Sequence, residues 1–430
     1  MHLRLRVHPV LTGTALALAF AGQVAAQSNI PSDDPGIKRA FAAIQSWNSW
    51  IIDNQVSLCE IPAPPFKEQA RGIEFRKRMI ALGYPDTKID AIGNVIAERA
   101  GRGSGPTVLI TGHLDTVFPE GTDVKVKRTG TRLDGAGIGD DCRGLVVILA
   151  VARALNEAKI ETRGKVILVA NVGEEGPGNL RGVREILTNG YKGKIDQFIS
   201  VDGTGFGVTS RAVGSHRYNV VFTGPGGHSY GAFGNVPSAI HAMGRAISNV
   251  GDLVPPASLK TTYNVGVVKG GTSVNTISPD AAMEVDMRSE SVDNLTKMDQ
   301  LIHDAIAKGV AAENGRWTRA PGKVTVKYDT IGIRPVGRVV QNDSTPIVKV
   351  ALDAAKALGL PTGPSGSGST DSNLPMSMGI PAMTIDGGGR GGNAHAAGEW
   401  YDDGTDGYKG PQWALLIVAA LAGIARTTTP

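Results

Sequence analysis

The sequence predicts an α/β protein in which a mainly parallel sheet is flanked by helices and a smaller α+β domain is inserted. Short apolar runs, each followed by glycine or an acidic residue, are typical of strands buried on both faces of a sheet. A helical pattern between the first two runs indicates a strand–helix–strand unit. Between residues 211 and 328 the strands instead have one polar face. The 430-residue chain is too long for one core, which favours two domains.

The first 26 residues have the features of a secretory signal peptide. Arg4 and Arg6 precede an apolar stretch from about Val10 to Ala21, and small residues lead up to Ala26. The apolar stretch is shorter than the roughly 20 residues needed to span a bilayer, so a retained anchor is the less favoured interpretation. We expect an exported protein, periplasmic or secreted, whose mature chain begins near Gln27.

The remaining elements follow from the spacing of apolar residues. Two N-terminal helices are expected at residues 37–61 and 66–82, the second ending at Gly83. Buried strands are expected at 108–111, 166–170, 198–201 and 382–385, with a helix at 143–158. In the insertion we expect strands at 217–223 and 281–288 and helices at 237–250 and 292–310.

These elements place the two parts of the main domain at residues 27–210 and 329–430, and the insertion at 211–328. The apolar run from Trp413 to Ala425 is predicted to be a buried helix, because it is too short to cross a membrane. With 44 basic and 40 acidic residues and no basic run, the chain is not expected to bind nucleic acid. Its two cysteines, Cys59 and Cys142, could form a disulfide after export, but two buried thiols are slightly favoured.

His113 is the first candidate site residue. It follows the buried run from Val108, at the point where a parallel strand would end, and Asp115 lies two residues further on. A carboxylate hydrogen-bonded to a ligand histidine fixes its tautomer, so the pair suits a metal site. A local hydrogen bond is the more common reason for such a pair, and the other polar clusters must decide.

Further clusters follow the other predicted strands and helices. Each has an ordinary alternative: a helix cap, a solvated pair of glutamates, an Asx-turn or a loop hydrogen bond. Because strands of an open α/β sheet gather ligands at their carboxyl ends, however, we expect these residues to meet. Two histidines and three carboxylates suit two zinc ions, with Mn²⁺ or Co²⁺ as substitutes, and leave one glutamate free to act as a base. The clusters contain Asp140, Glu174, Glu175, Asp202 and His395.

In this order, His113-x-Asp115, Asp140-Asp141, Glu174-Glu175, Asp202 and His395-x-x-x-Glu399 resemble the motifs of the co-catalytic zinc peptidases of clan MH. That family includes carboxypeptidase G, peptidase T, carnosinase, aminoacylases and succinyl-diaminopimelate desuccinylase. The resemblance covers essentially the whole mature chain and implies a role for each residue. Asp140 would bridge the metals, His113 and Asp202 would hold one, and Glu175 and His395 the other. Glu174 would be the general base, and Asp115 would orient His113.

The insertion resembles the lid of the same family. There the resemblance implies a homodimer in which His228 reaches the active site of the partner subunit and stabilises the oxyanion. Asn275 and Arg288 would contact substrate, and Ser369 and Thr370 belong to a loop similar to one that binds the substrate carboxylate. A hairpin histidine without a catalytic role is the alternative for His228.

Two positions depart from the family pattern. Cys142 stands where relatives often have lysine, and a small buried residue is the favoured interpretation. Asp202 stands where the carboxypeptidase and acylase branch has glutamate, so it favours the aminopeptidase and dipeptidase branch. We therefore expect a di-zinc exopeptidase of aminopeptidase, dipeptidase or tripeptidase type, acting on short peptides or amino-acid amides through a metal-activated water. A carboxypeptidase or N-acyl-amino-acid amidohydrolase is the alternative.

Rival interpretations use fewer of these residues. Ser229 lies in a Gly-x-Ser-x-Gly pattern upstream of Asp371 and His395, the order of a serine hydrolase. This leaves the other acidic residues and His113 without a role. A non-catalytic binding protein would have to retain the full ligand set without activity. The glycine-rich run before Asp140 is similar to a dinucleotide loop, but the aspartate would repel a pyrophosphate.

Overall fold

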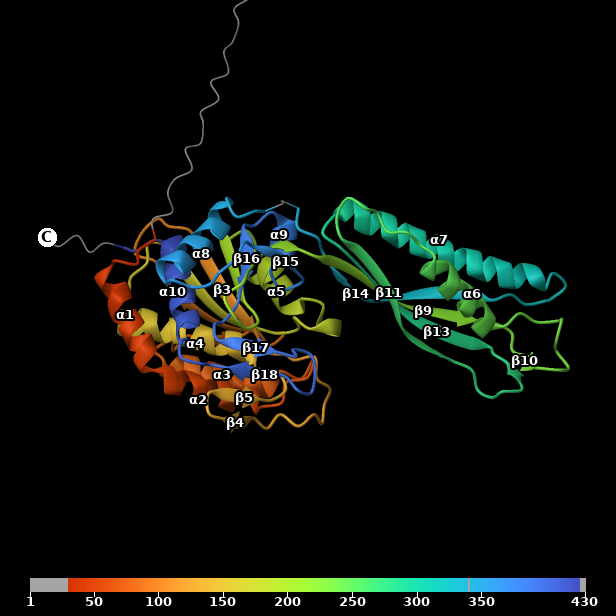
Figure 1. The fold of residues 1–430 in the computed structure, drawn as a ribbon, viewed down its shortest axis with the longest axis horizontal. Coiled ribbons are helices and arrows are strands. Elements are labelled where there is room, and N and C mark those ends of the chain that lie inside the picture. Colours follow the sequence, from red (N-terminus) through yellow and green to blue (C-terminus); the bar gives the residue numbers. More distant parts are fainter. Residues whose placement is uncertain (1–29, 339–340, 426–430) are drawn as a thin grey trace, which may run out of the picture.

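The computed structural model describes residues 30–338 and 341–425, so the expected signal peptide at residues 1–26 lies outside it. These residues form a main domain around an eight-stranded sheet and an inserted lid domain that projects to one side (Figure 1). The predicted fold class is confirmed. None of the helices in this described part combines the length and apolarity needed to cross a membrane.

The main sheet is mostly parallel. Its central strands β6, β3, β7 and β16 all run in one direction, whereas β1 and β2 pair antiparallel at one edge and β8 pairs antiparallel with β16 near the other. Every residue of β3 and β6 is buried, which explains their continuous apolar sequence. In sheet order the strands are β1 (Lys88–Ile89), β2 (Val95–Arg99), β6 (Val166–Asn171), β3 (Val108–His113), β7 (Gln197–Val201), β16 (Ala382–Ile385), β8 (Val208–Ala212) and β15 (Gly366–Gly368).

Helix α4 (Cys142–Glu157) lies at the centre of the main core. It packs against the sheet and against the neighbouring helices α1, α2 and α10, so nearly all of its residues are buried. The helix expected at 37–61 is two helices, because the chain leaves the helical conformation at Trp47. The other main-domain helices are α1 (Pro35–Ser46), α2 (Asn48–Cys59), α3 (Gln69–Ala81), α5 (Arg181–Glu185), α8 (Pro346–Ala357), α9 (Asn373–Met378) and α10 (Lys409–Ala422), with short turns η1 (Gly176–Gly178) and η2 (Ile186–Gly190).

Cys59 and Cys142 form a disulfide, so the favoured interpretation of two buried thiols is wrong. Both residues are fully buried, as expected. The end of α2 packs beside the start of α4, which brings the two Cα atoms to 5.5 Å, a normal disulfide separation. This contact joins segments 83 residues apart and could not be inferred from either local sequence.

A small antiparallel sheet carries two loops toward the carboxyl edge of the main sheet. Its strand β18 pairs with β5, and this pairing brings the segment around residue 395 beside the segment that leads to α4. In order, its strands are β17 (Arg390–Gly392), β18 (Trp400–Asp402), β5 (Arg132–Asp134) and β4 (Lys127–Thr129).

The lid has its own antiparallel sheet and its own core. Helices α6 (Ala239–Gly251) and α7 (Val292–Arg316) cover one face of the sheet (Figure 1). The expected domain boundaries at residues 211 and 328 fall inside β8 and β14. In sheet order the strands are β11 (Thr261–Gly270), β13 (Asp280–Ser289), β9 (Gly214–Thr223) and β14 (Thr325–Arg334), with a separate pair β10 (Gly227–His228) and β12 (Thr276–Ile277).

Candidate metal centre and substrate cavity

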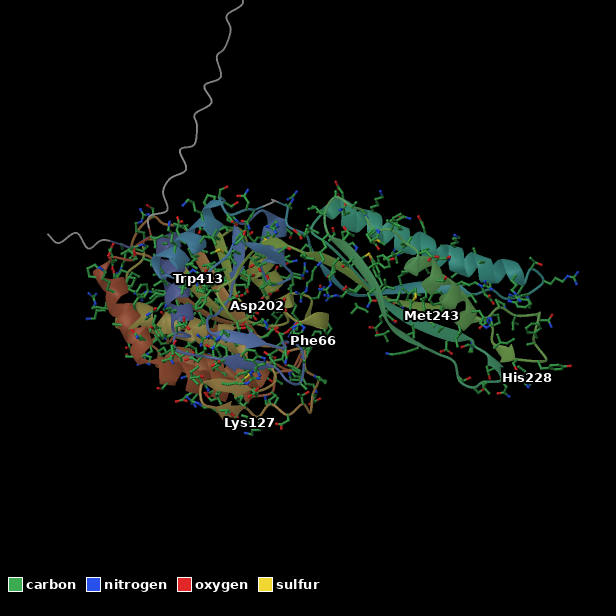
Figure 2. All side chains as sticks on the ribbon, in the orientation of Figure 1. Phe66, Lys127, Asp202, His228, Met243 and Trp413 are labelled. Carbon is green, nitrogen blue, oxygen red and sulfur yellow. A yellow bond between two sulfur atoms is a disulfide. The ribbon has the colours of Figure 1, made fainter. Side chains whose placement is uncertain are left out.

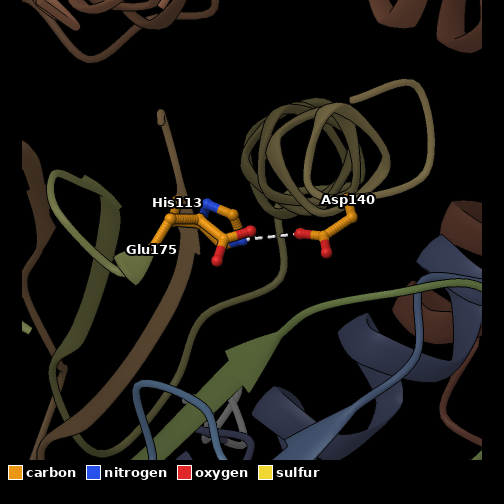
Figure 3. A group of neighbouring side chains, drawn as sticks. All are labelled: His113, Asp140 and Glu175. Carbon is orange, nitrogen blue, oxygen red and sulfur yellow. Dashed lines mark hydrogen bonds and ion pairs between the residues drawn. The ribbon is translucent and has the colours of Figure 1, made fainter. Parts of the chain in front are cut away.

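Three neighbouring parallel strands deliver the predicted ligands to one edge. β3 ends at His113, β6 is followed by Glu174 and Glu175, and β7 is followed by Asp202. Because β6, β3 and β7 are adjacent and parallel, their carboxyl ends lie side by side. The loop before α4 brings Asp140 beside His113 and Glu175 (Figure 3).

Asp140 lies between the two histidines. Its Oδ1 is 3.0 Å from Nε2 of His113, and its Oδ2 is 3.0 Å from Nε2 of His395. Nε2 of His395 is also 3.0 Å from Oε1 of Glu175. One carboxylate therefore shares its two oxygens between two imidazoles, which is the position that a bridging ligand needs.

Two overlapping groups in this cluster could each hold a cation. The ligand atoms of His113, Asp140 and Glu175 lie within 4.8 Å of one another, and so do those of His113, Asp141 and Asp202. The carboxylate of Asp141 already accepts hydrogen bonds from the backbone N–H groups of His113 and Gly144 at 2.8 and 2.9 Å. Asp141 thus caps α4 and braces β3, which leaves Asp202 as the freer carboxylate of the second group.

Asp115 contacts more than the histidine. Nδ1 of His113 lies 3.0 Å from the backbone carbonyl of Asp115 and 3.7 Å from its carboxylate. The carboxylate accepts hydrogen bonds from the backbone N–H groups of Gly173, Glu174 and Glu175, at 2.8 to 3.1 Å. The expected orientation of His113 therefore comes mainly from the carbonyl, and the carboxylate holds the loop that carries both glutamates.

Glu399 plays the corresponding part for the loop that carries Asp140. Its buried carboxylate accepts hydrogen bonds from the N–H groups of Gly137, Gly139 and Asp140 at 2.8, 2.8 and 2.9 Å. Glu399 lies four residues after His395 in the motif, and no role was predicted for it. The four-residue spacing places His395 in the ligand cluster and Glu399 against the backbone of the loop that carries Asp140.

Arg334, at the end of β14, is a site residue that was not predicted from the sequence. Its Nη1 donates to Oε1 of Glu174 at 2.5 Å, and its Nη2 donates to the backbone carbonyl of the same residue. Nη1 also lies 3.3 Å from Oγ of Ser369. Both partners of the ion pair are 5% exposed. An arginine in the last strand of the lid gives no local sign of contact with a glutamate 160 residues earlier.

A cavity of 530 Å³ opens over the cluster. The acidic ligands Asp140, Glu175 and Asp202 line it together with His395, and so do Ser369 and Thr370. Arg288 lines it too, together with Arg217, which was not predicted. Four of the five predicted metal ligands, the candidate base and part of the predicted substrate-binding set therefore line one cavity, and the fifth ligand, His113, is buried beside Asp140.

Two predicted lid residues lie outside this cavity. His228 is exposed at the end of the lid far from Asp202 (Figure 2), where its Nδ1 accepts the N–H groups of Tyr230 and Gly231 at 3.2 and 3.3 Å. Asn275 is paired with the same hairpin, because its carbonyl accepts the N–H of Ser229. A single chain does not bring His228 to its own metal cluster.

The serine-hydrolase interpretation is not supported by the structure. Ser229 lies next to His228 at the far end of the lid, whereas His395 contacts Asp140 in the main domain. Asp371 is fully buried, and its carboxylate accepts a hydrogen bond from Asn171 at 2.7 Å. The three residues of the supposed triad are thus separated.

The protonation of the cluster fits a cation site. Burial raises the pKa of Asp202 well above its usual range, and the charge of Asp140 adds to this effect. Burial also raises the pKa of Glu175. Hydrogen bonds to Asp140 and Glu175 raise the pKa of His395 to about 10. Bound divalent cations would displace protons from such ligands, and imidazole and carboxylate donors suit zinc-type cations.

Other proteins are similar to this chain in sequence and in fold. Residues 109–414 match peptidase family M20/M25/M40. The uncharacterized protein YqjE of Bacillus subtilis is 27% identical over 346 residues, which cover 77% of this chain and 85% of that protein. Indole-3-acetyl-aspartic acid hydrolase of Enterobacter agglomerans is 26% identical over 152 residues, 34% of each chain. Aminopeptidase PepT of Bacillus cereus has a similar fold, with a TM-score of 0.68 and 20% identity over 87% of this chain and 98% of that one. Because the family match spans most of the chain and the cluster offers ligand groups that could hold a cation, this protein is a member of peptidase family M20/M25/M40 and a metal-dependent hydrolase.

Proposed function

We propose that this enzyme is an exopeptidase that hydrolyses amide bonds of short peptides or amino-acid amides with two zinc ions, for which Mn²⁺ or Co²⁺ can substitute. The observation that carries the proposal is the position of Asp140 between His113 and His395, with Glu174 left over in the same cavity. In the proposed arrangement Asp140 would bridge the cations, His113 and Asp202 would hold one, and Glu175 and His395 would hold the other.

The chain supplies the proton transfers. When bound, the cations would lower the pKa of a water molecule and polarise the scissile carbonyl. Glu174 would take the proton from that water and pass it to the leaving nitrogen. Arg334 holds Oε1 of Glu174, and no hydrogen-bond donor among the described residues contacts Oε2. The base is therefore fixed in place by one oxygen while the other can accept the proton.

Asp202 and the side chains of the cavity favour different branches of the family. Asp202 and the peptidase T fold support an aminopeptidase, dipeptidase or tripeptidase. One observation favours the alternative, a carboxypeptidase or N-acyl-amino-acid amidohydrolase. The carboxylates that line the cavity are all assigned to the metals or the base, so none remains for a substrate ammonium, whereas Arg217, Arg288 and Arg334 can bind a substrate carboxylate. The relative that hydrolyses indole-3-acetyl-aspartic acid acts on such an N-acyl amino acid.

We further propose a homodimer formed through the lid. Large apolar side chains are exposed there, including Val267 and Val268 on the edge strand β11 and Tyr230 and Phe233 near the end of the lid. Exposed edge strands and apolar patches are typical of association surfaces. A partner would also supply His228 to a cavity that its own chain leaves without it.

Export is proposed on two grounds. The N-terminal segment has the features of a signal peptide. The Cys59–Cys142 disulfide fits the periplasm or the exterior, where disulfides persist. N-terminal sequencing of the protein recovered outside the cytoplasm should begin near Gln27; a chain that still begins at Met1 would contradict export with cleavage.

Product analysis by mass spectrometry tests the activity. The panel would contain free dipeptides, free tripeptides and their N-acylated counterparts, each incubated with and without a chelator. Chelator-sensitive release of the N-terminal residue from free peptides alone supports the aminopeptidase or dipeptidase branch. Chelator-sensitive cleavage of acylated substrates supports the alternative branch, and cleavage that resists the chelator would overturn the proposal.

A further inference from the structure

We infer that the Cys59–Cys142 disulfide is a redox-controlled anchor for the metal centre. With the bond formed, the segments that carry the ligands are held in place; without it, the folded chain binds divalent cations weakly. The inference rests on the proposed pair of cations and adds a condition for their binding. Both cysteines are positioning residues, because they act through the loop beside them and not by contact with a cation or a substrate.

The disulfide joins the end of α2 to the loop that carries Asp140. Cys59 is the last residue of α2, and Cys142 is the first residue of α4, two residues after Asp140. Gln55, one turn earlier in α2, reaches the other side of this loop, because its Nε2 donates to the carbonyl of Ile138 at 2.8 Å. Helix α2 thus holds the chain on both sides of the candidate bridging ligand.

The same end of α2 is tied to the segment that carries His113. Arg71 is fully buried, and its guanidinium donates to the carbonyl of Cys59 at 3.2 Å and to the carbonyl of Leu114 at 2.8 Å. Leu114 directly follows His113. Two ligand-bearing segments are therefore attached to one helix end, so the position of that end affects the distance between their ligands.

The disulfide lies in a small apolar core of its own, distinct from the large core of the main domain. The buried side chains packed with the two cysteines are Ile52, Leu133, Ile138 and Tyr401. Leu133 is on β5 and Tyr401 is on β18, in the small sheet whose β17 and β18 flank the segment of His395. The bond therefore lies where α2, the loop of Asp140 and the sheet beside His395 meet.

A core of this size depends strongly on one cross-link. The large core includes residues of α1, α4, α8 and α10 and contains neither cysteine, so the main fold should survive loss of the bond. The small core has few other contacts, and weakly packed regions open locally while the rest of a protein stays folded. Cations bind only the ordered site, so local opening lowers their apparent affinity.

The bond makes metal binding depend on oxidation. When it forms, the two sulfur atoms join, and two electrons and two protons pass to a disulfide oxidant, which is released as two thiols. Thiols keep cysteines reduced in the cytoplasm, whereas disulfides persist outside it. A chain held in a reducing compartment would bind cations weakly, and the proposed export would supply the condition for tight binding. Once formed, the bond is fully buried, which protects it from reductants in solution.

The test measures zinc affinity by competition with a chromogenic chelator and needs no substrate. The double variant Cys59→Ala/Cys142→Ala should bind zinc at least about tenfold more weakly than oxidised wild-type protein, as is typical when the support of metal ligands is lost. The control is Leu149→Ala, which removes a buried side chain from α4 in the large core. It should lower the melting temperature but keep the zinc affinity. Wild-type affinity in the folded double variant would overturn the inference.

Reversal by an oxidant gives a second test on the wild-type chain. Protein refolded with reduced glutathione should bind zinc as weakly as the double variant once the glutathione is removed. Treatment with oxidised glutathione should then restore the affinity of the wild-type protein and leave the double variant unchanged. Tight zinc binding by the reduced protein would contradict the anchor. So would failure of the reduced protein to fold, because the large core is expected to fold without the bond.

Hydrogen exchange locates the effect in the chain. In the metal-free double variant, faster exchange should be confined to residues 133–142 and the small sheet, with β3 and β6 unchanged. Equally faster exchange throughout the main domain would indicate general destabilisation and refute the anchor. If oxidised wild-type protein binds no zinc, the proposed metal centre itself fails. If oxidised and reduced proteins bind zinc equally tightly, that centre stands and only the anchor is refuted.

Discussion

Replacement of Glu399 by glutamine should weaken metal binding without touching a metal ligand. The carboxylate accepts one N–H on Oε2, from Gly137, and two on Oε1, from Gly139 and Asp140. In Glu399→Gln the amide nitrogen must face one of these donors. The least costly placement leaves the N–H of Gly137 unpaired and buried, at about 1–3 kcal/mol. The other two bonds lose their charge, at about 0.5–1 kcal/mol each, so the loop that carries Asp140 loses about 2–5 kcal/mol.

The assay is a competition for metal between the protein and a chromogenic chelator. Loss of a residue that supports metal ligands typically lowers affinity tenfold to a hundredfold, and we expect a decrease in this range for Glu399→Gln. The control is Glu313→Gln in the lid, since Glu313 is also a buried glutamate that accepts three N–H donors, from Ser238, Arg245 and Trp317. The control should lose stability but keep metal affinity. Wild-type affinity in a folded Glu399→Gln protein would show that Glu399 does not support metal binding through the loop that carries Asp140.

Three more predictions follow from contacts in the site and the core. Glu174→Gln should retain both metals by elemental analysis but lose turnover by about 10²–10⁴-fold, and near-normal turnover would remove Glu174 as the base. Replacement of Cys59 and Cys142 by alanine should lower the free energy of unfolding of the main domain by up to about 4.5 kcal/mol, since the bond closes a loop with a separation of 83 residues; an unchanged denaturant midpoint would contradict this. His228→Ala should lower kcat more than it changes KM, and co-expression with Glu174→Gln should restore part of the activity through mixed dimers; an effect on KM alone, or no restoration, would count against action in the partner's site.

Local sequence patterns predicted the parts of this molecule that depend on local chemistry. β3 and β6 were predictable because a strand buried on both faces has a continuous apolar run, and the polar residue after each run marked the ligand edge. The long N-terminal helix was expected to be continuous because the apolar spacing continues through Trp47, where the chain turns from α1 into α2.

Contacts between distant segments were not predictable in the same way. The Cys59–Cys142 disulfide depends on how α2 packs on α4, and the contact of Arg334 with Glu174 depends on where the last strand of the lid re-enters the main domain. In both contacts, the local sequence around one residue does not indicate which distant residue it will meet. The hydrogen bond from Arg217 on β9 to Asp286 on β13 likewise depends on the register of these two strands, which only the folded sheet defines.

Anomalous diffraction at the zinc edge from crystals of the zinc-loaded enzyme tests whether Asp140 bridges two cations. We expect two anomalous peaks, one on each side of Asp140, with His113 and Asp202 at the first and Glu175 and His395 at the second. A single peak, or two peaks that do not share Asp140, would show that Asp140 is not a bridging ligand.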